Sequence, residues 1–217
     1  MQYQAILFDL DGTLLNTLAD LGNSVNRILK RHGFTTHTPD QYKRFVGDGA
    51  KMLIQRALPQ AHRRDALVQS CLDEYLTDYR ENWQVDTCLY PGIAEMLNKL
   101  NDRPISLAIV SNKPHALTEQ CTRAFLEKWP FQVILGQKAS MPKKPDPTGA
   151  LWVAGKLDVP PSSCVFVGDS GVDMQTAVAA GMDPVGVSWG FRPEAELREH
   201  GARMLLNHPS ELTTCFA

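Results

Sequence analysis

The sequence predicts an α/β protein whose core is a doubly wound parallel sheet, with a small bundle of helices inserted into it. Three short apolar runs, typical of strands buried on both faces, each end on a residue that can do chemistry. From residue 104 onward, apolar runs alternate regularly with amphipathic helical segments. Between residues 16 and 86 that alternation stops and helical patterns dominate. Strands alternating with helices indicate a parallel sheet, and the interruption indicates an insert.

The three apolar runs are the candidates for neighbouring central strands. The first leads to Asp9, the second to Ser111 and the third to Asp169. The runs span residues 6–8, 107–110 and 164–168. Ligands of open parallel sheets bind beyond the carboxyl ends of the strands. If the three strands are neighbours, these side chains meet at one edge of the sheet.

The other elements follow from hydrophobic periodicity. Further strands are expected over residues 133–135 and 184–187, and helices over residues 92–100, 116–127, 147–157 and 173–180. In the insert, a stripe of apolar residues between positions 18 and 29 predicts one helix, and residues 52–57 and 67–75 suggest two or three more. We therefore expect a core of residues 1–15 and 87–217 and a helical cap of residues 16–86. The cap would act as a lid, with residues 14–17 and 87–91 as linkers.

Composition limits the classes of partner. The 217 residues suffice for one core and an insert, and 22 basic against 24 acidic residues give a net charge of −2. Without a basic block, nucleic acid is not an expected partner. Neither a signal peptide nor a run of about 20 apolar residues is evident, so we expect a cytoplasmic protein without a membrane partner. Five scattered cysteines indicate free thiols, and either a monomer or a homodimer is compatible with the sequence.

Four carboxylates dominate the predicted edge of the sheet. They are Asp9, Asp11, Asp169 and Asp173. A phosphomonoester is a dianion, so a carboxylate nucleophile is repelled by it unless positive charge is brought in first. Carboxylate and carbonyl oxygens suit Mg2+, whereas zinc favours histidine and cysteine ligands. No histidine of the sequence lies in a convincing metal-ligand motif. The cluster therefore predicts a bound cation, with Lys144 as the main lysine beside it.

Four motifs occur in a fixed order along nearly the whole chain. They are DLDGT at residues 9–13, SNKP at 111–114, KPDP at 144–147 and GDSGVD at 168–173. Their order and spacing resemble the four motifs of the haloacid dehalogenase superfamily. The resemblance implies a Rossmann-like core, a helical cap and a Mg2+-dependent phosphatase that hydrolyses the phosphomonoester of a small cytosolic metabolite.

The resemblance also implies roles for individual residues. Asp9 would attack phosphorus and become an aspartyl-phosphate, while Asp11 would protonate the leaving oxygen and later accept a proton from water. Asp9 and Asp169 would bind Mg2+ through their side chains, and Asp11 through its backbone carbonyl. Asp173 would complete the metal site, cap the following helix, or do both.

Further residues are expected around the phosphate. Ser111 and Lys144 would hold the phosphoryl oxygens, and Gly12 would let the backbone approach them. Thr13 and Asn112 complete the set of substrate contacts that the resemblance implies. Lys113 is expected to be solvated, and Trp189 to pack in the core or at an interface.

The segment VGDGAK at residues 46–51 resembles the substrate loop in the caps of phosphoglycolate phosphatases. Gly47 and Gly49 would let backbone amides approach a substrate carboxylate, although a plain turn between helices would also explain them. The SNKP motif and residues 186–190 also resemble phosphoglycolate phosphatases. The best candidate substrate is therefore 2-phosphoglycolate. Asn16 departs from the pattern, because many relatives carry an aspartate there, and it lies at the expected hinge.

Other functions remain open at this point. A β-phosphoglucomutase or a pyrophosphatase of the same superfamily would share the chemistry of Asp9. A receiver module also places a phospho-accepting aspartate, a hydroxyl residue and a lysine at strand ends, but it has no such insert. The lifetime of the phosphoaspartate separates an enzyme from a signalling module. A catalytically inactive binding protein is disfavoured by the intact acidic and lysine motifs.

Overall fold

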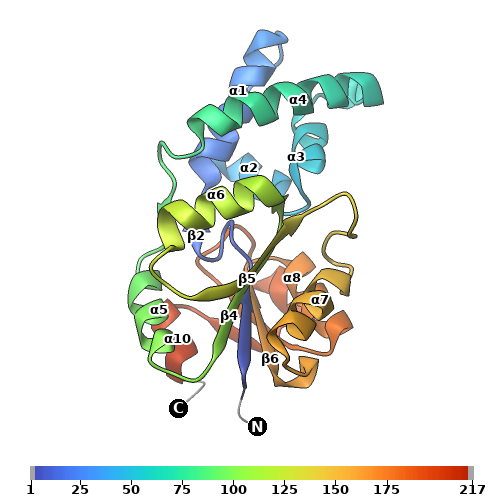
Figure 1. Cartoon of the computed structure of the whole chain (residues 1–217). Coiled ribbons are helices and arrows are strands. Elements are labelled where there is room, and N and C mark those ends of the chain that lie inside the picture. Colours follow the sequence, from blue (N-terminus) through green and yellow to red (C-terminus); the bar gives the residue numbers. More distant parts are fainter. Residues whose placement is uncertain (1–2, 215–217) are drawn as a thin grey trace. The chain divides into compact units, whose positions relative to one another are not determined.

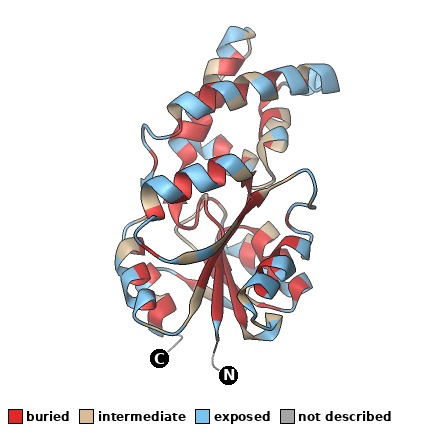
Figure 2. Cartoon of the chain, viewed as in Figure 1, coloured by how far each residue is buried: buried red, intermediate tan, exposed pale blue. Residues whose placement is uncertain are grey.

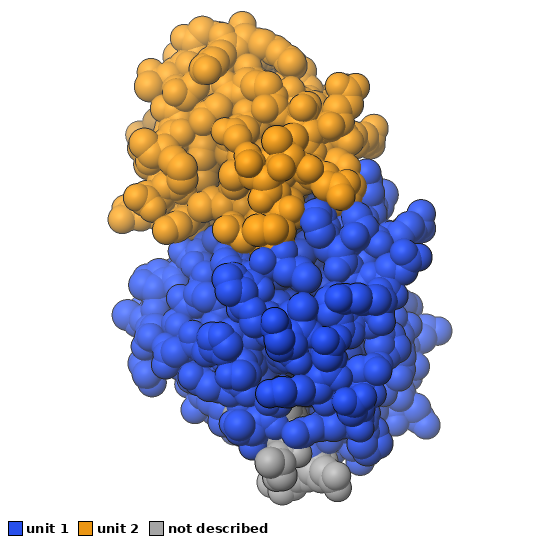
Figure 3. All heavy atoms as spheres, turned by 90° about the vertical axis from the view of Figure 1, so that its left-hand side faces the viewer, with its two compact units in different colours: residues 1–15, 89–217 blue, residues 16–88 orange. Residues whose placement is uncertain are grey.

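A computed structural model of the chain describes residues 3–214 (Figure 1). The chain forms two compact units, Met1–Leu15 with Leu89–Ala217 and Asn16–Cys88 (Figure 3). The chain crosses between them twice, within strands β2 (Leu15–Asn16) and β3 (Cys88–Leu89), which pair as a two-stranded sheet. The second boundary thus follows Cys88, where the sequence placed it after residue 86.

The first unit contains a parallel sheet of six strands in the order β5-β4-β1-β6-β7-β8. The strands are β1 (Ala5–Phe8), β4 (Ser106–Pro114), β5 (Phe131–Gln137), β6 (Cys164–Gly168), β7 (Asp183–Val187) and β8 (Met204–Leu206). Ile6 of β1 lies opposite Leu107 on one side and Val165 on the other. The three apolar runs are therefore neighbouring parallel strands, and the predicted α/β class is confirmed.

Helices cover both faces of this sheet (Figure 1). They are α5 (Ile93–Asn101), α6 (His115–Leu126), α7 (Thr148–Leu157), α8 (Gly171–Ala180), α9 (Glu194–Glu199) and α10 (Pro209–Thr214). Helices α7 and α8 lie on one face, and α5 packs against α10 on the other. The sequence predicts the first four of these helices to within two residues at either end.

The central strands β1 and β6 are fully buried, whereas the edge strands β5 and β8 are partly exposed (Figure 2). All four residues of β1 are inaccessible to solvent, and its Leu7 packs with Phe166 of β6 and Val153 of α7. Burying such side chains contributes roughly 1.5–3 kcal/mol each, which fixes the strands next to one another. The rigid sheet thereby holds the residues at its carboxyl edge in place.

The second unit is a bundle of helices. It contains α1 (Leu18–Arg31), α2 (Pro39–Phe45), α3 (Ala50–Ala57), the short 3-10 helix η1 (Gln60–His62) and α4 (Asp65–Asn82). Helices α1 and α4 pack together, and Arg27 pairs with the buried Asp78 at 2.5 Å. The buried carboxylate of Asp20 accepts hydrogen bonds from the backbone N–H groups of residues 85–87. This contact ties the start of α1 to the segment that leaves the unit.

The described residues also test two simpler expectations. Cys71, Cys121 and Cys164 are buried free thiols and Cys88 is an exposed one, while Cys215 lies outside the described residues. Across residues 3–214, every helix is too short or too polar to traverse a lipid bilayer.

Candidate active site

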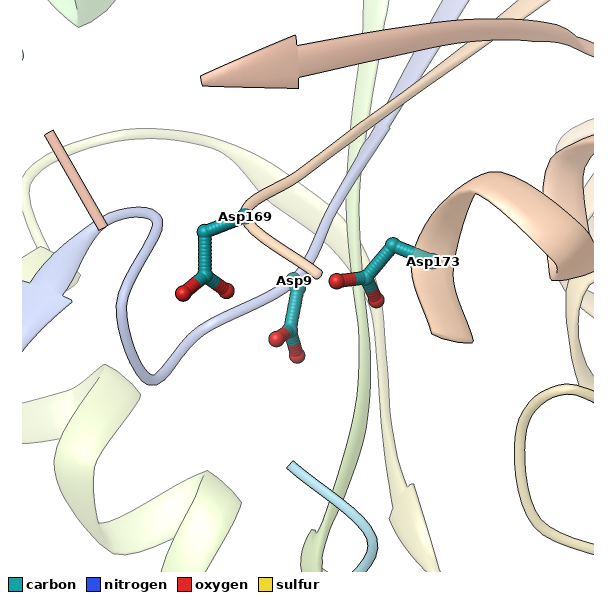
Figure 4. Close-up of side chains that lie close together, drawn as sticks. All are labelled: Asp9, Asp169 and Asp173. Carbon is teal, nitrogen blue, oxygen red and sulfur yellow. The ribbon is translucent and has the colours of Figure 1, made fainter. Parts of the chain in front are cut away.

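Three buried carboxylates converge at the carboxyl edge of the sheet (Figure 4). Asp9 follows β1, Asp169 follows β6 and Asp173 lies in the first turn of α8. Each offers an oxygen atom within 4.8 Å of the others. The neighbouring parallel strands β1 and β6 have aligned carboxyl ends, which bring together residues that are far apart in the sequence.

The carboxylate of Asp169 accepts a backbone hydrogen bond and lies against two glycines, which leave space for it. The backbone N–H of Phe191 donates to its Oδ2 at 2.7 Å. A Cβ atom on Gly12 would lie 2.3 Å from Asp169 Oδ2, and one on Gly190 would lie 2.2 Å from Asp169 Cβ. Gly12 has a φ of 92°, in the region that favours glycine. Both glycines therefore make room for this carboxylate.

Asp173 has two structural tasks at once. Its Oδ2 accepts hydrogen bonds from the backbone N–H of Ser170 at 3.1 Å and from the Ser170 hydroxyl at 2.6 Å, which forms a capping box at the start of α8. Its Oδ1 accepts a hydrogen bond from Lys144 Nζ at 2.6 Å. The capping role is therefore present, and it leaves the carboxylate beside the other two acids.

Lys144 is the buried cation of the cluster. Its Nζ lies 2.6 Å from Asp173 Oδ1 and 2.9 Å from Asp9 Oδ1, and it donates to the carbonyl oxygen of Val110 at 2.9 Å. The side-chain amide of Asn112 is hydrogen-bonded to the backbone N–H and C=O of Lys144. These hydrogen bonds position the main chain of Lys144, and the expected contact of Asn112 with substrate stays a prediction.

The electrostatics of the cluster favour a further positive charge. Burial and, to a lesser extent, the charge of Asp173 together raise the pKa of Asp9 to about 7 against the attraction of Lys144. Burial, with the charges of Asp173 and Asp9, holds the pKa of Asp169 well above its usual value. Burial works against the ammonium of Lys144, but Asp173 and Asp9 outweigh it and raise its pKa. One ammonium therefore does not balance three carboxylates.

These residues fit a hard divalent cation. The three converging ligand groups are all carboxylates, and hard cations such as Mg2+ prefer oxygen ligands. Asp9 Oδ1 is buried and accepts no well-directed hydrogen bond from the described residues, although Lys144 Nζ lies 2.9 Å away. An incompletely satisfied buried carboxylate oxygen is what a metal ligand presents before it binds its ion.

Asp11 belongs to a second ion pair. Lys113 Nζ lies 3.0 Å from Asp11 Oδ1 and 3.1 Å from Oδ2, and the Lys113 side chain is only 3% exposed. The expectation that Lys113 is solvated is therefore wrong, because Asp11 compensates its charge. Lys113 lies in the last part of β4, where the pairing with β5 is irregular, so alternation along the strand does not predict the direction of its side chain.

The remaining predicted site residues lie as follows. Ser111 is buried, and its hydroxyl oxygen accepts a hydrogen bond from the Lys113 backbone N–H at 3.2 Å. The Thr13 hydroxyl is buried without a hydrogen-bond partner among the described residues, and the Thr13 carbonyl accepts from Trp189 Nε1 at 3.0 Å. Trp189 thus holds the loop after β1, a role that the sequence did not reveal.

The two predicted cap glycines lie in the second unit. Gly47 and Gly49 lie between α2 and α3 with φ values of 113° and 85°, and Gly49 is the residue before α3. Asp48, between them, pairs with Arg56 at 2.5 Å. Both glycines therefore occupy backbone conformations that other residues rarely adopt.

Known proteins are similar to this chain in sequence and in fold. Residues 6–187 match the family described as haloacid dehalogenase-like hydrolase. Phosphoglycolate phosphatase from Pseudomonas putida is 34% identical over 194 residues, which cover 86% of this chain and 70% of the relative. Phosphoglycolate phosphatase from Colwellia psychrerythraea is 31% identical over 214 residues, which cover 96% of this chain and 95% of the relative. A predicted phosphoglycolate phosphatase from Haemophilus somnus, solved at 1.90 Å, has a TM-score of 0.92 at 29% identity, covering 100% of this chain and 99% of that one.

The match spans most of the chain and includes all four motifs. It agrees with the parallel sheet and with the acidic cluster at the ends of β1 and β6. The resemblance inferred from the motifs is confirmed, and the chain belongs to the haloacid dehalogenase-like hydrolases.

Proposed function

We propose that this protein is a Mg2+-dependent phosphatase that hydrolyses small phosphomonoesters through an aspartyl-phosphate at Asp9, with 2-phosphoglycolate as the best candidate substrate. The observation that carries the proposal is the buried cluster of Asp9, Asp169 and Asp173 around Lys144. The names of the relatives support the choice of substrate. A cytoplasmic setting, a small metabolite as the partner and a monomeric or homodimeric state are part of the same proposal.

The cation would be held by Asp9, Asp169 and Asp173, and it would offset the negative charge of the nucleophile and of the phosphate. Lys144 lies 2.9 Å from Asp9 Oδ1, so its ammonium can hold a phosphoryl oxygen beside the nucleophile. The Ser111 hydroxyl oxygen accepts from a backbone N–H, which leaves the hydroxyl hydrogen to donate to a phosphoryl oxygen. Both donors are buried and therefore pre-organised.

The reaction then has two balanced steps. An Asp9 carboxylate oxygen forms a bond to phosphorus while the bond from phosphorus to the leaving oxygen breaks, and Asp11 gives its proton to that oxygen. A water molecule next attacks the phosphorus of the aspartyl-phosphate, gives a proton to Asp11 and releases Asp9 with inorganic phosphate. Asp11 is available for both tasks because its carboxyl group lies outside the cluster of three acids that would hold the cation.

The test is phosphate release by purified protein from a panel of compounds with and without Mg2+. The panel contains 2-phosphoglycolate, hexose phosphates, nucleotides, pyrophosphate and an aryl phosphate. We expect Mg2+-dependent release that is fastest from 2-phosphoglycolate and is abolished in Asp9→Asn. Release from none of the compounds, or full activity of Asp9→Asn, would refute the proposal.

The same preparation distinguishes the alternatives. Conversion of a hexose phosphate into its isomer without phosphate release would indicate a mutase, and a preference for pyrophosphate would indicate a pyrophosphatase. A phosphoaspartate that persists instead of turning over would indicate a signalling module.

A further inference from the structure

We propose that Lys113 is a specificity-determining residue that binds a carboxylate on the leaving alcohol. The preferred substrates would then be phosphomonoesters whose alcohol carries a carboxylate on the carbon next to the ester oxygen. This inference rests on the proposed function and extends it, because it assigns recognition of the leaving group to a residue of the first unit.

The two buried lysines of the site contact different acids. Lys144 Nζ lies within 2.9 Å of Asp9 and Asp173. Lys113 Nζ lies 3.0 and 3.1 Å from the two carboxylate oxygens of Asp11. Phosphoryl transfer takes place at Asp9, whereas the leaving alcohol departs beside Asp11. Lys113 is therefore the cation on the leaving-group side of the site.

The position of Asp11 limits where the alcohol can go. To deliver its proton, an Asp11 carboxyl oxygen must come within about 2.6–3.2 Å of the leaving oxygen. Since Lys113 Nζ contacts both oxygens of that carboxyl group, it lies one hydrogen bond beyond the leaving oxygen. In a 2-carboxylate alcohol, a single carbon separates the leaving oxygen from the carboxylate, so the carboxylate can reach the ammonium while Asp11 contacts the oxygen.

Burial makes this contact selective. The Lys113 side chain is 3% exposed, and an ammonium excluded from water is costly unless anionic partners surround it. A substrate carboxylate would add a second anionic partner beside Asp11, whereas an alkyl or sugar group in the same place would not. A site built to pair a charged group rejects analogues that lack it.

The experiment compares 2-phosphoglycolate with ethyl phosphate, which has the same skeleton without the carboxylate. Wild type, Lys113→Met and Lys113→Arg are assayed for kcat/KM on both compounds. We expect Lys113→Met to lower kcat/KM for 2-phosphoglycolate by about tenfold to a hundredfold more than for ethyl phosphate, mainly through KM. Lys113→Arg should retain part of the preference.

The outcomes separate this inference from the function on which it rests. If Lys113 had a merely structural role, Lys113→Met would lower kcat/KM equally for both substrates, and that result would overturn the inference. If Lys113→Met does not fold, Lys113→Gln is assayed in its place, and an equal loss of kcat/KM on both compounds contradicts the inference. If the wild type releases phosphate from neither compound nor from the wider panel, the proposed function fails and this inference fails with it.

Discussion

Replacing Gly190 with alanine should disable the metal site while leaving the fold intact. The added Cβ would lie 2.2 Å from Asp169 Cβ and 2.6 Å from Asp169 Oδ2. Carbon atoms in contact sit about 3.5–4.0 Å apart, so the Asp169 side chain would have to retreat by roughly 1 Å or more. The backbone of Gly190 is not in the positive-φ region, and alanine therefore adds only this steric conflict.

A displacement of that size is large for a metal ligand. Productive sites hold their groups to within roughly 0.5 Å, and a misplacement of about 1 Å can cost on the order of 100-fold in rate. We therefore expect Gly190→Ala to lower kcat/KM about 100-fold and to weaken the apparent affinity for Mg2+. Overpacking of this kind should also lower the free energy of unfolding by about 1–3 kcal/mol.

The assay is a Mg2+ titration of phosphate release, together with the shift in melting temperature that Mg2+ produces. Gly155→Ala in α7 is the matched control, because a Cβ there meets no atom within 4 Å. It should match the wild type in both measurements. If Gly190→Ala also bound Mg2+ and turned over like this control, the argument that Gly190 makes room for Asp169 would be refuted.

Three further perturbations follow from the contacts described above. Asn112→Ala leaves the backbone N–H and C=O of the buried Lys144 without these hydrogen bonds, so kcat should fall about tenfold and the free energy of unfolding in urea should fall by about 1–3 kcal/mol. Unchanged kcat would contradict the positioning role. Asp20→Ala leaves the backbone N–H of the buried Thr87 without its acceptor. Because each hydrogen bond to a charged group contributes roughly 1.5–3 kcal/mol, the free energy of unfolding in urea should fall by about 3 kcal/mol. A loss under about 1 kcal/mol would contradict the structural role of Asp20. For Asp78, burial disfavours the charge, but hydrogen bonds from Arg27 and Ser24 outweigh it and hold the pKa below its usual value. Its stabilisation is therefore complete above the unfolded pKa of about 3.9 and is lost as pH falls through the folded pKa. The stability difference between wild type and Asp78→Asn should shrink below about pH 4, and a constant difference would contradict this assignment.

The sequence was sufficient to predict the sheet and the edge where chemistry occurs. Apolar runs that end on Asp9, Ser111 and Asp169 could be placed together because parallel neighbours align their carboxyl ends. The short elements β8, α9 and α10 were missed, since three to six residues do not show a period. Lys113 was misplaced because lysine is usually exposed, and its pairing with Asp11 depends on a contact between distant segments.

The groups that orient the site could not be predicted for a related reason. The Phe191 N–H and the bare backbone of Gly190 reach Asp169 from beyond β7. The Asn112 amide reaches the main chain of Lys144. Such contacts depend on how loops fold over the sheet, and no local pattern of residues encodes them.

The two ion pairs explain how four carboxylates can share one edge of a sheet. The ammonium of Lys144 pairs with Asp9 and Asp173, whereas that of Lys113 pairs with Asp11. Each lysine offsets the charge of a different part of the site, so Asp9, the proposed nucleophile, and Asp11, the proposed proton carrier, have different surroundings. The opposite roles proposed for two aspartates that lie two residues apart therefore depend on which lysine each one contacts.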